Sequence, residues 1–291
     1  AGTLWQLALP SMFSMLFHTL FHLVDTVFVA WLGESSLAAM SLTFPLMFVI
    51  FALVNGMAVG TTTRMSNSLG HGQVDEAQGY ADSALLLVLI LTTPALPLLF
   101  RPSSDAFFSL LGGSGDVLPE SYRYATWLVL GTPLMAFSLI ADSTFRSQGD
   151  TVTPMKSMIL GNGINAILDP IMIFTFGWGI AGASIATFIG RLASCLYLWS
   201  RLKKRSPLIP GLTWRPDHPR KWISVGEIGL PVAISQGSMA VGSALLNRIL
   251  SGYGPAAIGA FMLGNRVEMF VFLPVFGFNG ALVPFIGYNI G

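Results

Sequence analysis

Residues 145–174, FRSQGDTVTPMKSMILGNGINAILDPIMIF, join a polar turn to an apolar helix that carries an acidic residue. Thr153 is predicted to be the N-cap of this helix, which has the length and apolar character of a membrane span. Asn162, Asn165 and Asp169 follow at spacings of three and four residues, so their side chains share one helix face. An ionised carboxylate at the centre of a bilayer costs roughly 2.5 to 3.5 kcal/mol on insertion scales. We therefore expect this face to line a cavity or to contact other helices.

The composition of the whole chain is that of a membrane protein. Its 291 residues are 53% hydrophobic and 10% charged, and the mean hydropathy is +0.68, whereas an ordinary soluble domain has about 25% charged residues. The fold class predicted is an all-α polytopic membrane protein. A net charge of +1 gives no reason to expect a nucleic-acid partner. The single cysteine, Cys195, excludes an intrachain disulfide.

Hydropathy predicts a series of spans, each near the ~20 residues needed to cross ~30 Å of hydrocarbon. They cover residues 4–29, 37–59, 81–99, 122–145, 154–176, 182–202, 223–250 and 256–280. Basic residues gather in or beside the connections after the second, fourth and sixth spans: Arg64, Arg146, Lys156, Arg201, Lys203, Lys204, Arg205, Arg215, Arg220 and Lys221. The other connections have only Arg101 and Arg123. The positive-inside rule therefore predicts a multi-pass protein of the plasma membrane, the bacterial inner membrane, with a cytoplasmic N-terminus.

An internal repeat is visible at an offset of 221 residues. The offset carries Leu9-Pro10 onto Leu230-Pro231, and Gly33, Gly56 and Gly70 onto Gly254, Gly277 and Gly291. One proline and three glycines at one offset argue for a repeat, and an even number of helices between the copies makes it parallel. We expect a six-helix lobe at 1–202, a cytoplasmic linker at 203–221, and the first two helices of a second lobe at 222–291. The repeat predicts a longer, twelve-helix protein.

Several motifs are specific enough to indicate a family. They include Leu23-Val24-Asp25-Thr26, the run 145–151 with Pro154, Leu168-Asp169-Pro170, and Asn265-Arg266-Val267-Glu268. These motifs resemble those of the multidrug and toxic compound extrusion (MATE) transporters, and the last one resembles the DinF-like bacterial branch. The glutamate that NorM-like members carry in the seventh helix is absent between Pro231 and Met239. The resemblance implies a two-lobe, V-shaped antiporter that exports small organic cations and drugs.

The same resemblance implies that a proton or sodium gradient drives the transport, with no cofactor. It implies that the protein is not an enzyme, and that it works as a monomer among membrane lipids. Two carboxylates with Asn and Thr oxygens suit either H⁺ or Na⁺, so the residues leave the coupling ion open.

The candidate ion-coupling and substrate-binding residues lie on several predicted spans. Counting along the helices places Asp25, Asn165, Asp169 and Thr187 at a similar depth, in the outer half of the membrane, where the resemblance would place a cation site of the first lobe. Asp25 and Asp169 are also the metal ligands if sodium is the coupling ion. Asp142, Asn162 and Glu268 complete the set, although Asp142 counts closer to the cytoplasmic end.

Each candidate also has a purely structural interpretation. A buried acid or amide can hold helices together through a hydrogen bond, and Glu268 can form an ion pair with Arg248 or Arg266. On the first span, Ser11, Ser14, His18 and His22 share one face with Asp25, and the histidines can either shuttle protons or satisfy a neighbour.

Other functional classes are less well supported. Residues 112–116, GGSGD, contain the letters of rhomboid-type GxSG and aspartyl-type GxGD intramembrane proteases. After Ser114, however, the only histidine is His218 in the predicted linker, and Asp116 lies in a glycine-rich turn outside the membrane. A lipid-linked oligosaccharide flippase is the stronger alternative, although such proteins usually present several arginines to a pyrophosphate.

The predicted orientation can be tested by cysteine labelling. A cysteine at Ser206 should react with an impermeant thiol reagent only from the cytoplasmic side, and one at Ser114 only from the outside. The basis is the excess of basic residues on one set of connections. The opposite labelling pattern would invert the orientation of every candidate site.

Overall fold

The computed structural model describes residues 2–213 and 217–251, together with residues 272, 275, 282, 283, 285 and 286. This part of the chain consists of helices and their connections, without a β-strand. Several of its helices are long and apolar enough to cross a membrane: Glu34–Gly70, Val74–Leu99, Val117–Ser147, Val152–Thr175 and Gly179–Lys204. The predicted class, an all-α multi-pass membrane protein, is confirmed.

The first seven predicted spans correspond to helices, whereas the eighth, at 256–280, lies outside the described residues except for Phe272 and Val275. The elements are α1 (Gly2–Ala30), α2 (Glu34–Gly70), α3 (Val74–Thr92), η1 (Thr93–Leu99), α4 (Arg101–Leu110), α5 (Val117–Leu130), α6 (Thr132–Ser147), α7 (Val152–Pro170), η2 (Ile171–Thr175), α8 (Gly179–Arg205) and α9 (His218–Ser251). α2 runs well past the predicted end of its span at Val59. The short helix α4 was not predicted at all, because ten residues that include charges give no hydropathy signal.

Prolines account for the irregular segments of the spans. Pro94 and Pro97 lie in η1, the 3₁₀ segment that continues α3, and neither can donate the backbone hydrogen bond that an α-helix needs. Pro170 ends α7, and the chain continues in η2 as a wider π-helical turn. Thr153 is not the N-cap of α7, as the sequence suggested. α7 begins at Val152, two residues before the predicted start, and Thr151 occupies the N-cap position. The Asp150 carboxylate accepts the backbone N–H groups of Val152 and Thr153 at 3.0 and 2.9 Å.

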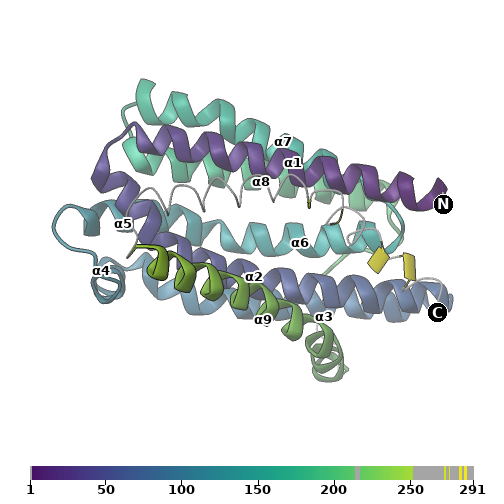
Figure 1. Cartoon of the computed structure of the whole chain (residues 1–291). Helices are drawn as coiled ribbons and strands as arrows, with labels where there is room; N and C mark the ends of the chain where they lie inside the picture. The colour runs from purple at the N-terminus through teal and green to yellow at the C-terminus, as the bar shows by residue number, and fades with distance from the viewer. Residues whose placement is uncertain are drawn as a thin grey trace.

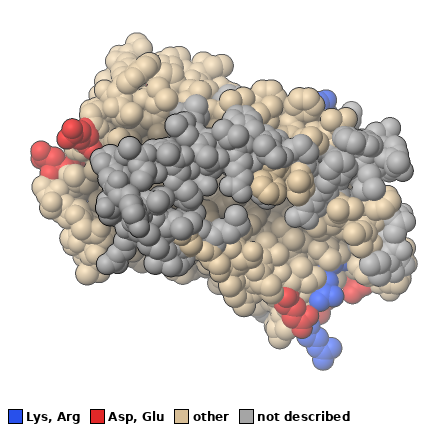
Figure 2. Space-filling model, viewed as in Figure 1, with Lys and Arg blue, Asp and Glu red and all other residues tan. Residues whose placement is uncertain are grey.

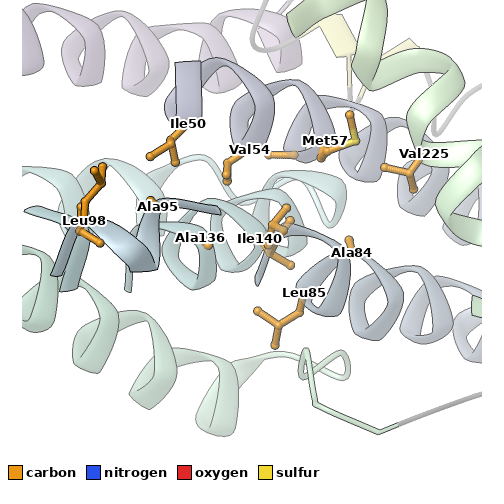
Figure 3. Close-up of a cluster of buried hydrophobic side chains, with 13 residues drawn as sticks. Ile50, Val54, Met57, Ala84, Leu85, Ala95, Leu98, Ala136, Ile140 and Val225 are labelled. Carbon is orange, nitrogen blue, oxygen red and sulfur yellow. The ribbon is translucent and has the colours of Figure 1, made fainter. Parts of the chain in front are cut away.

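The helices form two groups within the described part of the chain (Figure 1). α1, α7 and α8 lie together on one side, and α2, α3 and α9 lie together on the other, with α6 between them. The largest buried apolar cluster joins α2, α3, η1, α6 and the first part of α9 (Figure 3). Its members include Ile50, Val54, Leu85, Ile140 and Val225, each at most 7% exposed.

Two glycines allow α7 and α8 to cross closely. A Cβ atom on Gly190 would lie 2.5 Å from the backbone oxygen of Gly161, so any larger residue would force the helices apart. Close backbone approach at small residues is a common way for membrane helices to associate. The crossing places Asn165 of α7 opposite Thr187 of α8.

Exposed charges also agree with a membrane position. On the face shown in Figure 2, acidic and basic side chains gather near the two ends of the molecule, and the visible described surface between them is uncharged. Large apolar side chains of the spans are exposed instead, for example Phe44 at 63% and Ile167 at 66%. Such side chains can face lipid without cost.

The glycine crossing gives a prediction about stability. Gly190→Ala should lower the thermal unfolding midpoint and separate Asn165 from Thr187, because the new methyl group meets the Gly161 carbonyl. Gly163→Ala is the matched control: it lies on the same helix pair, but nothing lies within 4 Å of the added Cβ. The control should be neutral or slightly stabilising, since alanine favours a helix over glycine by about 1 kcal/mol. Equal midpoints for the two variants, measured in detergent, would contradict the packing described.

Candidate functional site

The centre of the candidate site is a pair of acids from α1 and α7. Asp25 is 8% exposed and Asp169 is fully buried. Their carboxyl groups lie within hydrogen-bonding range of each other. Two carboxyl groups at this distance can form a hydrogen bond only if one of them holds a proton, since an ionised carboxylate has no donor. The pair therefore favours binding of a cation, either a proton or a metal ion, over two bare negative charges.

Asn165 connects this pair to α8. Its Nδ2 atom lies 3.0 Å from Oδ1 of Asp169, one helical turn away, and 3.4 Å from Oγ1 of Thr187. Thr187 in turn donates to the Ala183 carbonyl at 3.0 Å. One oxygen of each acid, Oδ1 of Asp25 and Oδ2 of Asp169, is buried and has no hydrogen-bond partner. The structure thus brings together Asp25, Asn165, Asp169 and Thr187.

Two further residues belong to this region, although the sequence did not single them out: Tyr124 lies close to the acid pair, and Arg191 lies close to Tyr124. Tyr124 of α5 is 6% exposed, and its phenol lies near enough to Asp25, Asp169 and Arg191 to interact electrostatically. Arg191 of α8 hydrogen-bonds the Leu128 carbonyl at 3.4 Å. The position of Arg191, a basic residue inside an apolar span, was the sequence signal that could have identified it as a candidate. Tyr124 gave no comparable signal, because tyrosine is common at the ends of membrane helices.

Asp142 does not join the Asp25 and Asp169 pair. It lies on α6, and its carboxyl group is close enough to Arg146, one turn later, to interact with it electrostatically. Both side chains line a cavity of about 200 Å³, which Asn55 and Thr62 of α2 and Val283 also line. Oδ1 of Asp142 is buried without a hydrogen-bond partner. The lobe therefore has a second polar location with charges of both signs.

The other predicted residues are less central or cannot be placed. Asn162 is half-buried on α7, and no hydrogen bond from its side chain to Asn165, Asp169 or Thr187 is present. Glu268 lies outside the described residues, as do the side chains of Ser11, Ser14, His18 and His22. Their roles stay predictions.

The oxygen atoms around the acid pair could hold a small cation. Asp25 and Asp169 would supply the charge, the Thr187 hydroxyl one neutral oxygen, and the Asn165 amide another after rotation of its side chain, since the amide orientation is an assignment. Among the described residues, no cluster of three or more His, Cys, Asp or Glu side chains has the geometry of a metal site. A site of this composition suits a proton or Na⁺ better than a transition metal.

Comparisons with known proteins agree with the fold. The fold is that of a polytopic α-helical membrane protein with a polar site buried among its spans. The chain belongs to the MatE family, whose model matches residues 10–171 and again residues 231–291. The second match begins 221 residues after the first, which is the offset of the sequence repeat.

Curated relatives and solved structures are similar over nearly the whole chain. The FAD transporter of Shewanella oneidensis is 30% identical over 99% of this chain and 65% of its own length. The multidrug export protein MepA of Staphylococcus aureus is 28% identical over 97% and 63%. The chain thus spans about two thirds of the length of these relatives.

Among solved structures, a MOP superfamily transporter from Pyrococcus furiosus superposes with a TM-score of 0.88 at 29% identity, covering 99% of this chain and 64% of that one. An outward-facing multidrug resistance MATE transporter gives a TM-score of 0.89 at 30% identity, with 99% and 65% covered. The predicted MATE resemblance is confirmed.

Cation binding at the acid pair can be tested without transport. Acidification in sodium-free buffer, or addition of Na⁺ at neutral pH, should raise the thermal midpoint of the purified full-length protein, because a ligand at 100 times its Kd stabilises by about 2.7 kcal/mol. Asp169→Asn should remove that rise. Asp116→Asn, which changes an exposed acid outside the spans, is the control and should keep it. An unchanged cation response in Asp169→Asn would show that the pair does not bind the cation.

Proposed function

We propose that the protein is a secondary active antiporter that exports small organic cations and drugs by alternating access, with Asp25 and Asp169 as the ion-coupling pair. The observation that carries this proposal is a pair of buried, mutually close carboxyl groups on membrane helices of a MatE family chain. A scaffold protein has no need of such a pair, because an uncompensated acid in a membrane lobe is costly.

The proposed cycle uses the competition between an inward-moving cation and the exported compound. When H⁺ or Na⁺ occupies the pair, the site is less negative, so its electrostatic attraction for a cationic substrate is weak. Once the cation leaves, the pair attracts positive charge. One charge moving down ~100 mV supplies ~2.3 kcal/mol, enough for a roughly fifty-fold gradient of an uncharged load.

Asp142 and Arg146 add a substrate-facing element in this proposal. Their cavity lies against Val283, beyond α9, so it faces the second lobe, where an exported compound would pass. Charges of both signs allow polar compounds as well as simple cations to interact there. Asn165 and Thr187 position the Asp169 carboxyl group in the same proposal, and Asn162 lies one helical turn before Asn165 on α7.

A flavin nucleotide is a second candidate for the transported substrate, because the relative with 30% identity is an FAD transporter. A dinucleotide carries phosphate charge, which arginine binds through paired hydrogen bonds. Arg146 and Arg191 are two basic residues of the described spans that could bind such a phosphate group. Efflux of FAD that ethidium does not inhibit would favour this candidate over the export of organic cations.

The direct test is transport by the full-length protein in proteoliposomes, with proton and sodium gradients imposed separately. Asp169→Asn should be present at normal levels, since Asn is nearly the same size as Asp, yet gradient-driven efflux of ethidium should be lost because the site can no longer change its charge. Asp116→Asn should transport normally. Wild-type efflux rates for Asp169→Asn under the same gradient would exclude the proposed coupling pair.

A further inference from the structure

The segment that connects the two lobes is bound tightly to the first lobe. Gln78 of α3 pairs with the backbone of Ile209 in both directions, accepting its N–H at 2.9 Å and donating to its carbonyl at 2.7 Å. Asp82, one turn later, accepts the Gly211 N–H at 2.9 Å and the Thr213 hydroxyl at 3.0 Å. A linker that served as the hinge between lobes would need a backbone that is free to change its dihedral angles. Hydrogen bonds to α3 instead hold this linker at Ile209, Gly211 and Thr213.

The beginning of α9 is fixed to the same helix. His218 is fully buried, with one ring nitrogen bonded to the Ser83 hydroxyl and the other 2.8 Å from the Thr213 carbonyl oxygen. Trp222 stacks beside His218 and donates to the Ser83 carbonyl at 2.8 Å. Separation of α9 from α3 would leave these buried polar groups without partners, which is unfavourable.

Further along, α9 packs backbone to backbone against α2. The α2 residues Gly56 and Gly60 form a GxxxG pair, and a Cβ on either would collide with the carbonyl oxygen of Gly229 or Val225. A Cβ on Gly229 would lie 2.7 Å from the Gly56 oxygen. Val225 itself belongs to the apolar core of the first lobe, beside Met57 (Figure 3).

An ion pair reinforces this contact near the cytoplasmic end. Arg64 of α2 donates to the Ser224 carbonyl at 3.1 Å and pairs with Glu227 at 3.0 Å. Beyond this contact, Pro231 removes one helical hydrogen bond, and nothing lies within 4 Å of where a Cβ on Gly237 would stand. Proline and glycine are the usual sites at which helices bend.

We infer that the linker and the first turns of α9, up to Ala233, move with the first lobe. The second lobe then swings about the segment of α9 that follows, between Ala233 and Gly237. The point at which the chain passes from one moving lobe to the other is then inside α9, and not in the linker that precedes it. This inference rests on the proposed function in so far as transport requires the lobes to move.

The test cross-links α9 to α2 in the full-length protein carrying Cys195→Ser. Arg64→Cys and Glu227→Cys place thiols at positions that are 33% and 63% exposed, and bis-methanethiosulfonate reagents of graded length join them. We expect no loss of ethidium efflux on cross-linking, because the two helices stay together throughout the cycle. Loss of efflux that reduction restores would overturn the inference.

A control pair tests whether the lobes move beyond the anchored part. The control pair is Val59→Cys and Val283→Cys. Both positions line the cavity beside Asp142 and Arg146, and they lie on the two sides of the proposed bend. Cross-linking this pair should stop efflux, and reduction should restore it. Unimpaired efflux with the control pair cross-linked would also overturn the inference.

The two proposals can fail separately. If the reduced protein moves no compound under any gradient, the proposed function is wrong. The anchor is then tested by the yield of the Arg64 and Glu227 cross-link under opposite ion gradients. Equal yields support an anchored α9, and a gradient-dependent yield contradicts it.

Discussion

The structure depends on keeping two acidic groups together inside a membrane lobe. Asp25 and Asp169 are buried side by side, and two unneutralised carboxylates at this distance strongly disfavour each other. The surrounding helices make the arrangement tolerable: the α7 and α8 glycine crossing brings Asn165 within reach of both Asp169 and Thr187. Among the described residues, the unpartnered oxygens of the two acids have no hydrogen-bond donor. In the proposed function, a bound cation supplies the missing positive charge. A site that needs an exchangeable cation is what an ion-coupled exporter requires.

The two groups of helices have different roles in the lobe. α1, α7 and α8 carry the acid pair, and the prolines Pro10 and Pro170 leave α1 and the end of α7 able to bend when the charge changes. α2, α3 and α6 form the larger apolar core, to which the linker and the first part of α9 are fixed (Figure 1). In the mechanism we propose, a change at the acid pair alters one side of the lobe, while the other side stays fixed and the second lobe swings against it.

Features encoded within one helix could be predicted from the sequence, and features that depend on distant residues could not. The spacing of Asn165 and Asp169 on α7 predicted a shared face, and counting along the spans was enough to place Asp25 and Thr187 at a similar depth. Their functional roles remain untested. Tyr124 and Arg191 were missed because the proximity of Tyr124 to the pair, and of Arg191 to Tyr124, depends on how α5 and α8 pack. The docking of the linker on Gln78 and Asp82 joins residues far apart in the chain. The sequence predicted an N-cap at Thr153, whereas the N-cap position is Thr151 and the Asp150 carboxylate accepts the first free N–H groups. Thr and Asp both favour helix starts, so the sequence alone does not decide between neighbouring positions.

The central claim is that the acid pair holds a cation that the exported compound displaces. Infrared difference spectroscopy of the full-length protein in sodium-free buffer measures this directly, because a protonated carboxyl group has its own carbonyl band. The account predicts that ethidium removes such a band in the wild-type protein and in Asp116→Asn, but not in Asp169→Asn. If sodium is the ion, the account predicts instead that Na⁺ shifts the carboxylate bands and that ethidium reverses the shift, again only while Asp169 is present. The claim would be contradicted if the protein binds ethidium but neither the carboxyl nor the carboxylate bands change on addition of ethidium or Na⁺.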